Sequence, residues 1–395
     1  MVAHSFPRAA GDIAGVWIGH LAEALAARGH AVTVIAPADR GERGAPTLGR
    51  VAVRRVRYAA PSRETLAYKG TMHRAAGTNP LAAVAFFGLV RAMARAVAEE
   101  CRAAPVDVVH AHWWIPGGLA AAFAARRGRP LIVTLHGTDV ALSRKLPGGR
   151  WLMGVVLRRA AAVTAVSSAL AEAAAAALGA GAGRGAADIA LTPMPLAPAG
   201  TAEAAPNGAG ERRGAVFVGR LTAQKHVGDL IEALAILAGR GERLPLTVVG
   251  EGPERAALER RAAGAGLGGD VTFTGAVPPE AVAGQLAGKR LFVLPSVDEG
   301  LGLAVAEALV AGVPVVATRS GGIPDLMTEE DAGALVPPGD PAALAEAMAR
   351  VARDDRYLAG ARRAGRALLE RLSPEAVAAN VEAIYGTVLS RRSRA

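Results

Sequence analysis

The chain of 395 residues is 51% hydrophobic but only 4% aromatic, and this length allows two or three domains with large cores. Its net charge of +10 is uneven, because residues 1–180 hold 22 Lys and Arg against 10 Asp and Glu, whereas residues 181–395 hold 23 against 25. The basic residues are scattered rather than interleaved with stacking aromatics, which argues against nucleic acid as a partner. The single cysteine, Cys101, excludes an intramolecular disulfide and a cysteine-based metal cluster.

The charge asymmetry and the lack of targeting signals predict where the protein works. A positive N-terminal half suits an anionic membrane face or an anionic substrate, although arginine-rich solvated surface is an equal alternative. The N-terminus lacks a signal-peptide pattern, and the longest strongly apolar run, 81–90, is shorter than the roughly 20 residues that span a bilayer. We therefore expect a cytoplasmic protein, peripheral on the inner face of the cell membrane. Enrichment in Ala, Gly and Arg indicates a GC-rich, bacterial genome.

In chain order, the first half alternates short apolar strands with amphipathic helices. Trp17, Leu21 and Leu25 recur at helical spacing, and Gly29 follows them as a typical C-terminal residue. Short β-branched runs come next at 31–37, 106–112, 130–137 and 161–167, each ending in polar residues. This alternation predicts a parallel sheet with helices on both faces. The opening MVAHSFP leaves fewer residues than the usual five or six for a first strand.

The second half repeats the pattern after a break. Residues 192–214 are rich in Pro, Gly and Ala without a periodic apolar face, which is typical of a linker. Strand-like runs then resume with AVFVGR, LTVVGEG, VTFTG, LFVLPS and PVVAT, and the charged RRSRA tail is expected to be disordered. We predict two doubly wound, Rossmann-like parallel-sheet domains, whose ligands bind beyond the C-terminal strand ends. The predicted boundaries are 1–195 for the first domain, 196–213 for the linker, 214–373 for the second domain, and 374–390 for a C-terminal helix that packs back on the first.

Two stretches of the second half carry candidate chemistry. In FVGRLTAQK, Gly219 ends a strand, and Arg220 and Lys225 flank the loop before a helix, which suits a phosphate ligand. For an isolated Arg/Lys pair, two solvated surface cations are the commoner interpretation. In DEGLGLAVAE, Glu299 precedes a predicted helix that contains Glu307.

The turn between these glutamates favours an anion such as a diphosphate. Gly300 and Gly302 let the backbone approach a ligand closely. The N–H groups and the positive end of the helix that begins at Leu303 would face that ligand. The two carboxylates suit hydroxyl groups of a sugar or a ribose instead.

Taken together, these motifs resemble glycosyltransferase family 4. The resemblance is carried by VGRLTAQK, VVGEGPE, FTGAV, and EGLGLAVAEALVAGVPVVAT followed by SGGIPDL, and it extends to FPRAAGDIAG, HAHWWIPGG and HGTD in the first half. It implies the GT-B fold, in which two Rossmann-like domains face each other across a cleft, the first for the acceptor and the second for the donor. It also implies a retaining, metal-independent hexosyltransferase that uses a nucleotide-diphosphate sugar and no cofactor.

The resemblance implies a role for each candidate residue. Arg220 and Lys225 would contact the diphosphate, Glu299 the transferred sugar, and Glu307 the ribose, while His136 would face the sugar from the N-terminal side. Outside the HGTD context, a hydrogen-bonded histidine at a strand end is the commoner interpretation of His136. The catalytic set is thus His136, Arg220, Lys225 and Glu299, and the donor-binding positions are Gly15, Gly219, Gly250, Val277, Gly300, Leu301, Gly302, Leu303 and Glu307.

Three further positions qualify this assignment. Asp139 would position the loop after the HG pair, with a helix-capping or surface role as the alternative. Leu301 stands where the family often has phenylalanine, a conservative change because backbone groups make the expected contacts. His226 stands where glycine is common, which puts the local loop geometry in question.

The expected reaction moves the sugar to an acceptor hydroxyl of a sugar, a lipid-linked or a small-molecule acceptor. It would serve glycolipid, cell-envelope polysaccharide or small-glycoside synthesis. The alternative is a nucleotide-sugar epimerase on the same fold, which would need no acceptor. A nicotinamide-dependent dehydrogenase is disfavoured because AAGDIAGV lacks the Gly-x-Gly-x-x-Gly pattern. A non-catalytic sugar-nucleotide module would not need the four charged residues of the second half.

Overall fold

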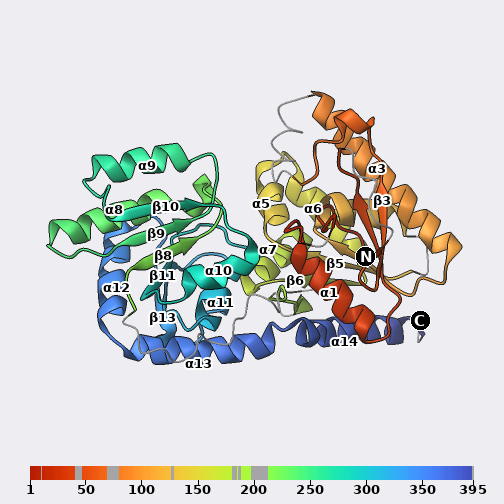
Figure 1. Cartoon of the computed structure of the whole chain (residues 1–395). Helices are drawn as coiled ribbons and strands as arrows, with labels where there is room; N and C mark the ends of the chain where they lie inside the picture. Colours follow the sequence, from red (N-terminus) through yellow and green to blue (C-terminus); the bar gives the residue numbers. More distant parts are fainter. Residues whose placement is uncertain are drawn as a thin grey trace. The chain divides into compact units, whose positions relative to one another are not determined.

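The computed structural model contains two compact units (Figure 1). The first comprises residues 1–195 and 374–395, and the second comprises residues 196–373. Of the predicted linker, 196–213, the structure describes only the two ends, because residues 197–211 lie outside the described part of the chain. The structure describes residues 1–9, 11–40, 47–68, 80–125, 129–179, 185, 188–196 and 212–393.

The first unit is a parallel sheet flanked by helices. Its strands run in the order β2-β3-β1 and β4-β5-β6-β7, and every pair is parallel except β2 with β3. In chain order its elements are α1 (Val16–Ala27), β1 (Thr33–Pro37), β2 (Thr47–Leu48), β3 (Val51–Val56), η1 (Pro61–Arg63), α3 (Pro80–Ala103), β4 (Val109–His112), η2 (Trp114–Gly118), α4 (Leu119–Ala124), β5 (Leu131–Leu135), α5 (Thr138–Lys145), α6 (Gly149–Arg159), β6 (Ala162–Ala165), α7 (Ser168–Leu178), β7 (Ala190–Leu191) and α14 (Pro374–Ser393).

The opening strand is short. Val2 forms single parallel bridges to Ile35 of β1 and Ala111 of β4, and so joins the two groups of strands. The Val2 N–H donates to His110 O at 2.8 Å, and its carbonyl accepts from His112 N at 2.9 Å. The short bridge therefore completes a continuous sheet.

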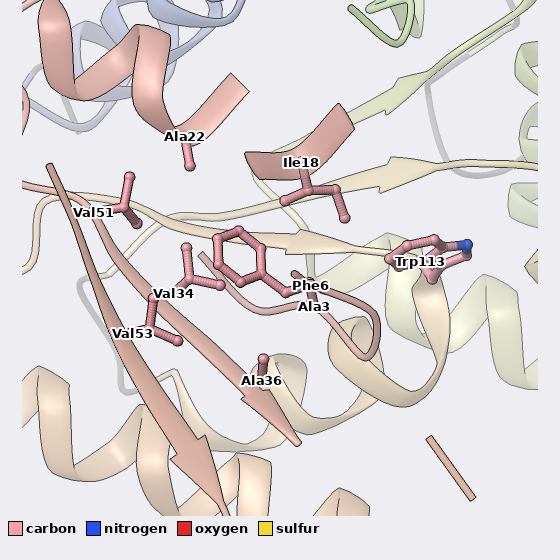
Figure 2. Packing of buried hydrophobic residues seen from close by; sticks show 9 residues of the cluster. All are labelled: Ala3, Phe6, Ile18, Ala22, Val34, Ala36, Val51, Val53 and Trp113. Carbon is pink, nitrogen blue, oxygen red and sulfur yellow. The ribbon is translucent and has the colours of Figure 1, made fainter. Parts of the chain in front are cut away.

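The hydrophobic core of this unit lies between α1 and the sheet. Figure 2 shows Phe6 at its centre, with Ile18 and Ala22 of α1 above it and Val34 of β1 beside it. Phe6 and Ile18 are fully buried, and full burial of such a side chain contributes roughly 1.5–3 kcal/mol. The loop between Val2 and α1 is thereby fixed to the sheet.

The C-terminal helix α14 packs on α1. Val377, Ala378 and Val381 form one buried cluster with Leu21 and Leu25 of α1. The helix ends at Ser393, so the prediction of a disordered RRSRA tail is wrong for its first three residues, and the predicted end at 390 is three residues early. The last two residues lie outside the description.

Helix α3 corrects the membrane analysis. The apolar run from the sequence stops at Arg91, but the helix continues to Ala103, and over 24 residues it is long and apolar enough to cross a bilayer by length and composition. Only 22% of its most apolar window is buried. Its buried residues include Leu89, Met93 and Val97, which hold one face of the helix against its own unit.

The second unit is a six-stranded, fully parallel sheet in the order β10-β9-β8-β11-β12-β13. The first strand in sequence is thus central, and the order reverses between β8 and β11, which is the Rossmann arrangement. The elements are β8 (Ala215–Val218), η6 (Ala223–Lys225), α8 (Val227–Gly239), β9 (Leu246–Val249), α9 (Arg255–Gly264), β10 (Val271–Gly275), α10 (Pro279–Leu286), β11 (Leu291–Leu294), α11 (Leu303–Val310), β12 (Val315–Thr318), η7 (Ile323–Asp325), η8 (Glu330–Ala332), β13 (Gly333–Val336), α12 (Pro341–Arg353) and α13 (Arg356–Arg371).

Candidate active site

Ligands of an open parallel sheet bind where the strand order reverses. In the second unit this point lies between β8 and β11, and the loops that follow those two strands contain Arg220, Lys225 and Glu299. Arg220 is exposed. The fold thus brings together three of the four predicted catalytic residues in one unit, although residue 299 lies 74 positions beyond residue 225.

Lys225 and Glu299 form an ion pair at this point. The Lys225 ammonium donates a hydrogen bond to Glu299 Oε1, and the two side chains are 19% and 11% exposed. Low exposure strengthens such a pair relative to one on the open surface. The pair fixes a positive and a negative group side by side, so an anion and a hydroxyl can be bound at adjacent positions.

The turn that carries Glu299 is held by contacts that the sequence analysis did not assign. Asp298 has a positive φ of 56°; its N–H donates to Ser320 Oγ at 2.9 Å, and its carbonyl accepts from Gln224 Nε2 at 3.0 Å. A Cβ on Gly321 would overlap the Glu299 carbonyl, at a φ of 58° that favours glycine. The SGGIPDL motif therefore supports the glutamate turn, and its paired glycines were the available signal.

Helix α11 begins directly after this turn. It starts at Leu303, as predicted, and ends at Val310, and Gly302 precedes it with a φ of 91°. Within the described residues, the N–H groups from Gly300 to Leu303 donate no hydrogen bond. Free donors at a positive helix end form an anion-binding arrangement, and they lie in the same loop as Glu299.

The Glu307 carboxyl has no hydrogen-bond or ion-pair partner among the described residues. Glu307 occupies the second turn of α11, and burial raises the pKa of its carboxyl to about 7. A half-buried carboxyl without partners is stabilised when hydroxyl groups donate to it. Glu307 is therefore suited to accept hydrogen bonds from a ligand diol.

The loops after β9 and β10 pack closely against the loop after β8. A Cβ on Gly250 would overlap the carbonyl of Gly219, and the Gly250 N–H donates to Gly275 O at 2.8 Å. Leu221 and Glu251 are joined by a backbone hydrogen bond of 2.9 Å. Val277 follows this cluster in a half-buried position. Gly219 and Gly250 therefore have a packing role, and their role toward a ligand stays a prediction.

The loop geometry at His226, which the sequence analysis put in question, is defined by the structure. His226 adopts a φ of 48°, the left-handed conformation that glycine adopts most readily, and its Nδ1 lies 3.2 Å from Asp229 Oδ2. Histidine is among the residues that tolerate this region better than most. The loop before α8 thus contains a left-handed residue at the position where the resemblance makes glycine common.

His136 belongs to the first unit, where it lies at the end of β5 among buried rings. Its Nε2 is 3.0 Å from His112 Nδ1, and its ring centroid is 4.6 Å from that of Trp113. Burial lowers the pKa of His136 to about 3, so the imidazole is neutral at neutral pH. It can therefore exchange hydrogen bonds with a ligand but cannot supply a positive charge.

His112 is a residue that the sequence analysis missed. Its Nδ1 is hydrogen-bonded to Nε2 of His136. The other ring nitrogens, His112 Nε2 and His136 Nδ1, are buried without a hydrogen-bond partner among the described residues. A cavity of about 10 Å³ adjoins both rings and Thr192, which is close to the volume of one water molecule. The signal was the HAHWW run at the end of a predicted strand.

Asp139 organises the loop after β5. Its carboxylate accepts from the backbone N–H groups of Trp114 at 3.0 Å, Gly137 at 2.9 Å and His136 at 3.2 Å. It is 3% exposed, and burial raises its pKa while these donors oppose the rise. Asp139 therefore joins the η2 turn to the loop that carries His136, in agreement with a positioning role.

Gly15 precedes α1, beside a larger cavity. A Cβ on Gly15 would overlap the carbonyl of Ser5. A cavity of about 250 Å³ lies along the other face of α1, and its lining includes Asp12, His20 and Glu23 over an apolar floor that includes Phe6. This volume far exceeds the roughly 10–15 Å³ that one water needs. The first unit thus offers room for a small polar ligand group.

The two Rossmann-like units define a class of α/β proteins that bind ligands at strand ends, and comparisons with known proteins narrow it. A family model described as "Glycosyl transferases group 1" matches residues 202–368, and one described as "Glycosyl transferase 4-like domain" matches residues 14–187. The 2-deoxystreptamine glucosyltransferase of Streptomyces kanamyceticus is 32% identical over 311 residues, which cover 71% of this chain and 78% of that enzyme.

A second relative and one solved structure extend the comparison, the latter for the fold alone. A GDP-mannose-dependent alpha-(1-6)-phosphatidylinositol dimannoside mannosyltransferase of Mycobacterium tuberculosis is 36% identical over 175 residues, and the match spans 44% of each chain, less than half the length of that relative. The solved structure of a sucrose-phosphate synthase from Thermosynechococcus elongatus superposes with a TM-score of 0.74 at 21% identity, covering 99% of both chains.

The chain belongs to glycosyltransferase family 4. It is an enzyme of the transferase class with the GT-B fold, and the predicted fold and activity class are confirmed. None of the matches supports the epimerase alternative.

Proposed function

We propose that this glycosyltransferase binds a nucleotide-diphosphate sugar at the strand-order reversal of its second unit and transfers the sugar to an acceptor hydroxyl with retention of configuration. The observation that carries the proposal is the Lys225–Glu299 ion pair beside the free N–H groups that precede α11. The relative named as GDP-mannose-dependent adds support for a nucleotide-sugar donor.

The residues divide the chemistry between leaving group and sugar. Arg220, Lys225 and the N–H groups before α11 stabilise the negative charge that develops on the departing diphosphate. Glu299 accepts hydrogen bonds from sugar hydroxyls, and Glu307 accepts them from the ribose. The bond between the anomeric carbon and the diphosphate oxygen breaks as the acceptor oxygen bonds to that carbon, and the acceptor proton passes to the departing diphosphate. This division requires no metal and no cofactor.

The acceptor is assigned to the first unit, in the cavity beside α1. His20 lines that cavity and its Nδ1 has no partner among the described residues. We propose a sugar, a small-molecule or a lipid-linked acceptor; the Streptomyces relative is named for 2-deoxystreptamine and the mycobacterial relative for phosphatidylinositol dimannoside. A His20→Ala variant should raise the KM for the acceptor and leave the affinity for the nucleotide unchanged.

A two-stage experiment tests the function. Thermal unfolding with a panel of nucleotide sugars should identify the donor, since a ligand at 100 times its Kd stabilises the protein by about 2.7 kcal/mol. Incubation of that donor with acceptors of both classes should release nucleoside diphosphate, with chelator present, and NMR should show an unchanged anomeric configuration. An inverted product, or a need for added metal, would contradict that part of the proposal, and an epimer formed without acceptor would contradict all of it.

The last part of the proposal concerns the source of the enzyme and its location in the cell. We propose that the enzyme is bacterial, works in the cytoplasm, and contacts the anionic inner face of the cell membrane. The uneven charge of the chain supports this, since residues 1–180 carry a net +12 and residues 181–395 a net −2. Fractionation of cells into soluble and membrane pools, with and without high salt, tests it.

A further inference from the structure

Among the described helices of the first unit, α3 carries the most exposed large hydrophobic residues. Leu81, Val84 and Phe87 are 65%, 69% and 72% exposed, and their spacing of three residues places them on one side of the helix. Figure 1 shows the beginning of α3 at the outer edge of its unit. Single exposed apolar residues are ordinary, but three large ones in a row indicate an interaction surface.

The same face becomes cationic further along the helix. Arg91 and Arg95 follow Phe87 at spacings of four residues, and both are exposed. Neither forms an ion pair with any residue that the structure describes. The acidic residues of the helix, Glu99 and Glu100, lie near its C-terminal end, where both pair with Arg54 of β3. The exposed stripe therefore runs from apolar to purely positive.

The opposite face of α3 is anchored in the protein. Leu89 and Met93 are fully buried, and Val97 is 2% exposed. A helix held in this way covers the surface of its unit and does not leave it to span a bilayer. The apolar stripe is consequently a fixed surface feature, and the geometry matches a helix that lies in a membrane interface.

Exposed apolar residues are also concentrated in this unit. Of the large hydrophobic residues that are exposed in the described part of the chain, Leu369 is in the second unit and the other eight are in the first. Three of those eight are aromatic: Phe87 of α3, and Phe123 and Trp151 on helices α4 and α6. The unit with the positive charge is thus also the unit with the apolar surface.

We propose that the outer face of α3 docks on an anionic lipid bilayer. Leu81, Val84 and Phe87 enter the boundary between headgroups and acyl chains, and the guanidinium groups of Arg91 and Arg95 bind lipid phosphates. The charge of this stripe favours lipid over a second copy of the chain, because the two arginines need anionic partners and the acidic residues of α3 already pair with β3. This inference names the surface for the membrane contact in the proposed function.

The test is flotation with vesicles of defined lipid. The full-length chain is mixed with vesicles of three parts phosphatidylcholine to one part phosphatidylglycerol, and with phosphatidylcholine alone. A variant with Phe87→Ser and Arg91→Glu removes one apolar and one cationic contact and should reduce partition into the anionic vesicles by about tenfold or more. The matched control, Leu369→Ser with Arg366→Glu on α13, changes an exposed leucine and an exposed arginine of the second unit and should float like the natural chain.

Three outcomes would overturn the inference. They are absence of flotation for the natural chain, equal flotation of the α3 variant, and equal binding to neutral and anionic vesicles. Light scattering without lipid covers the alternative occupant: a dimer that the α3 variant dissociates would identify this face as a contact between copies. Transfer to a water-soluble acceptor should be the same in the α3 variant and the natural chain, so a failed docking surface remains distinguishable from a failed assignment of the donor site.

Discussion

The strand ends of the two units differ in how they present polar groups. In the second unit, Lys225, Glu299 and unpaired backbone donors meet at the reversal of strand order. In the first unit, the corresponding strand ends carry His112 and His136, which are buried and neutral. One sheet therefore presents charge to a ligand, and the other presents rings and hydrogen-bonding atoms. The charged strand ends are those at which we propose that the diphosphate binds, and this contrast makes specific variants informative.

Loss of the central cation should have the largest effect. Lys225→Ala removes a positive charge that stabilises the departing diphosphate, and it leaves Glu299 without its ion-pair partner. We therefore expect kcat to fall by about 100- to 1,000-fold. The matched control is Lys289→Ala, because Lys289 also lies in the second unit but donates to Thr247 Oγ1 at 2.7 Å, away from the two loops. Steady-state kinetics of both variants decide the matter. Equal activity of Lys225→Ala and the natural enzyme would remove the charge-based assignment.

The glycine that supports the glutamate turn should come next. Gly321→Ala places a methyl group against the Glu299 carbonyl at a positive φ, and we expect a loss of about 2–4 kcal/mol in the free energy of unfolding, with weaker nucleotide binding. Gly268→Ala is the control, since Gly268 has open space around it and no left-handed φ. Chemical denaturation measures both. A Gly321→Ala variant as stable as the Gly268→Ala variant would show that the turn is not constrained.

Glu307 allows a test that depends on pH. Its pKa is about 7 in the folded protein and about 4.5 when unfolded, so between these values the folded state binds the extra proton and stability decreases as pH rises. Glu307→Gln should therefore raise the free energy of unfolding by about 1–3 kcal/mol near pH 8 and change little near pH 4.

The same substitution should weaken the nucleotide. The ionised carboxylate is the better acceptor for ribose hydroxyls, so the affinity of the natural enzyme for the nucleotide should fall as pH drops below about 7. Glu307→Gln should lose both affinity and this pH dependence, as calorimetry would measure. A more stable variant with unchanged affinity would mean that Glu307 does not contact the ribose.

The first unit should respond more weakly. His112→Ala frees Nε2 of His136 from its only hydrogen bond among the described residues, and kcat should fall by about tenfold with little change in the KM for the donor. Tyr385→Phe removes the hydrogen bond of 2.7 Å to His110, costs about 1 kcal/mol of stability, and leaves kcat unchanged. A loss with His112→Ala as large as with Lys225→Ala would contradict the contrast between the units.

The regular construction of parallel sheets explains why much of this architecture could be predicted from the sequence. Continuous apolar runs such as 130–137 mark buried parallel strands, and the residues after them lie at one edge of the sheet. That rule is enough to bring Lys225 and Glu299 to one place. Strand β3 was missed, because two arginines interrupt its VAVRRV run, and β13 was missed because GALV is short and begins with glycine.

The details of the site required the folded structure. The ion pair between Lys225 and Glu299, the pairing of His112 with His136, and the support of the glutamate turn by Gly321 all join residues at least 22 positions apart. No local pattern encodes such contacts, since they depend on how the strands are ordered and how loops pack. Helix α3 shows that a local pattern can also mislead. The apolar run in the sequence stops before Arg91, but the helix continues past this residue to Ala103.

The packing of α14 on α1 has a consequence for biosynthesis. Leu21 and Leu25 of α1 are covered by Val377 and Val381, residues that leave the ribosome more than 350 positions later. During translation the second unit is therefore complete before the first, although the first begins earlier. A nascent chain stalled before residue 374 should display the apolar face of α1 to chaperones, and this exposure ends only when the last helix is released.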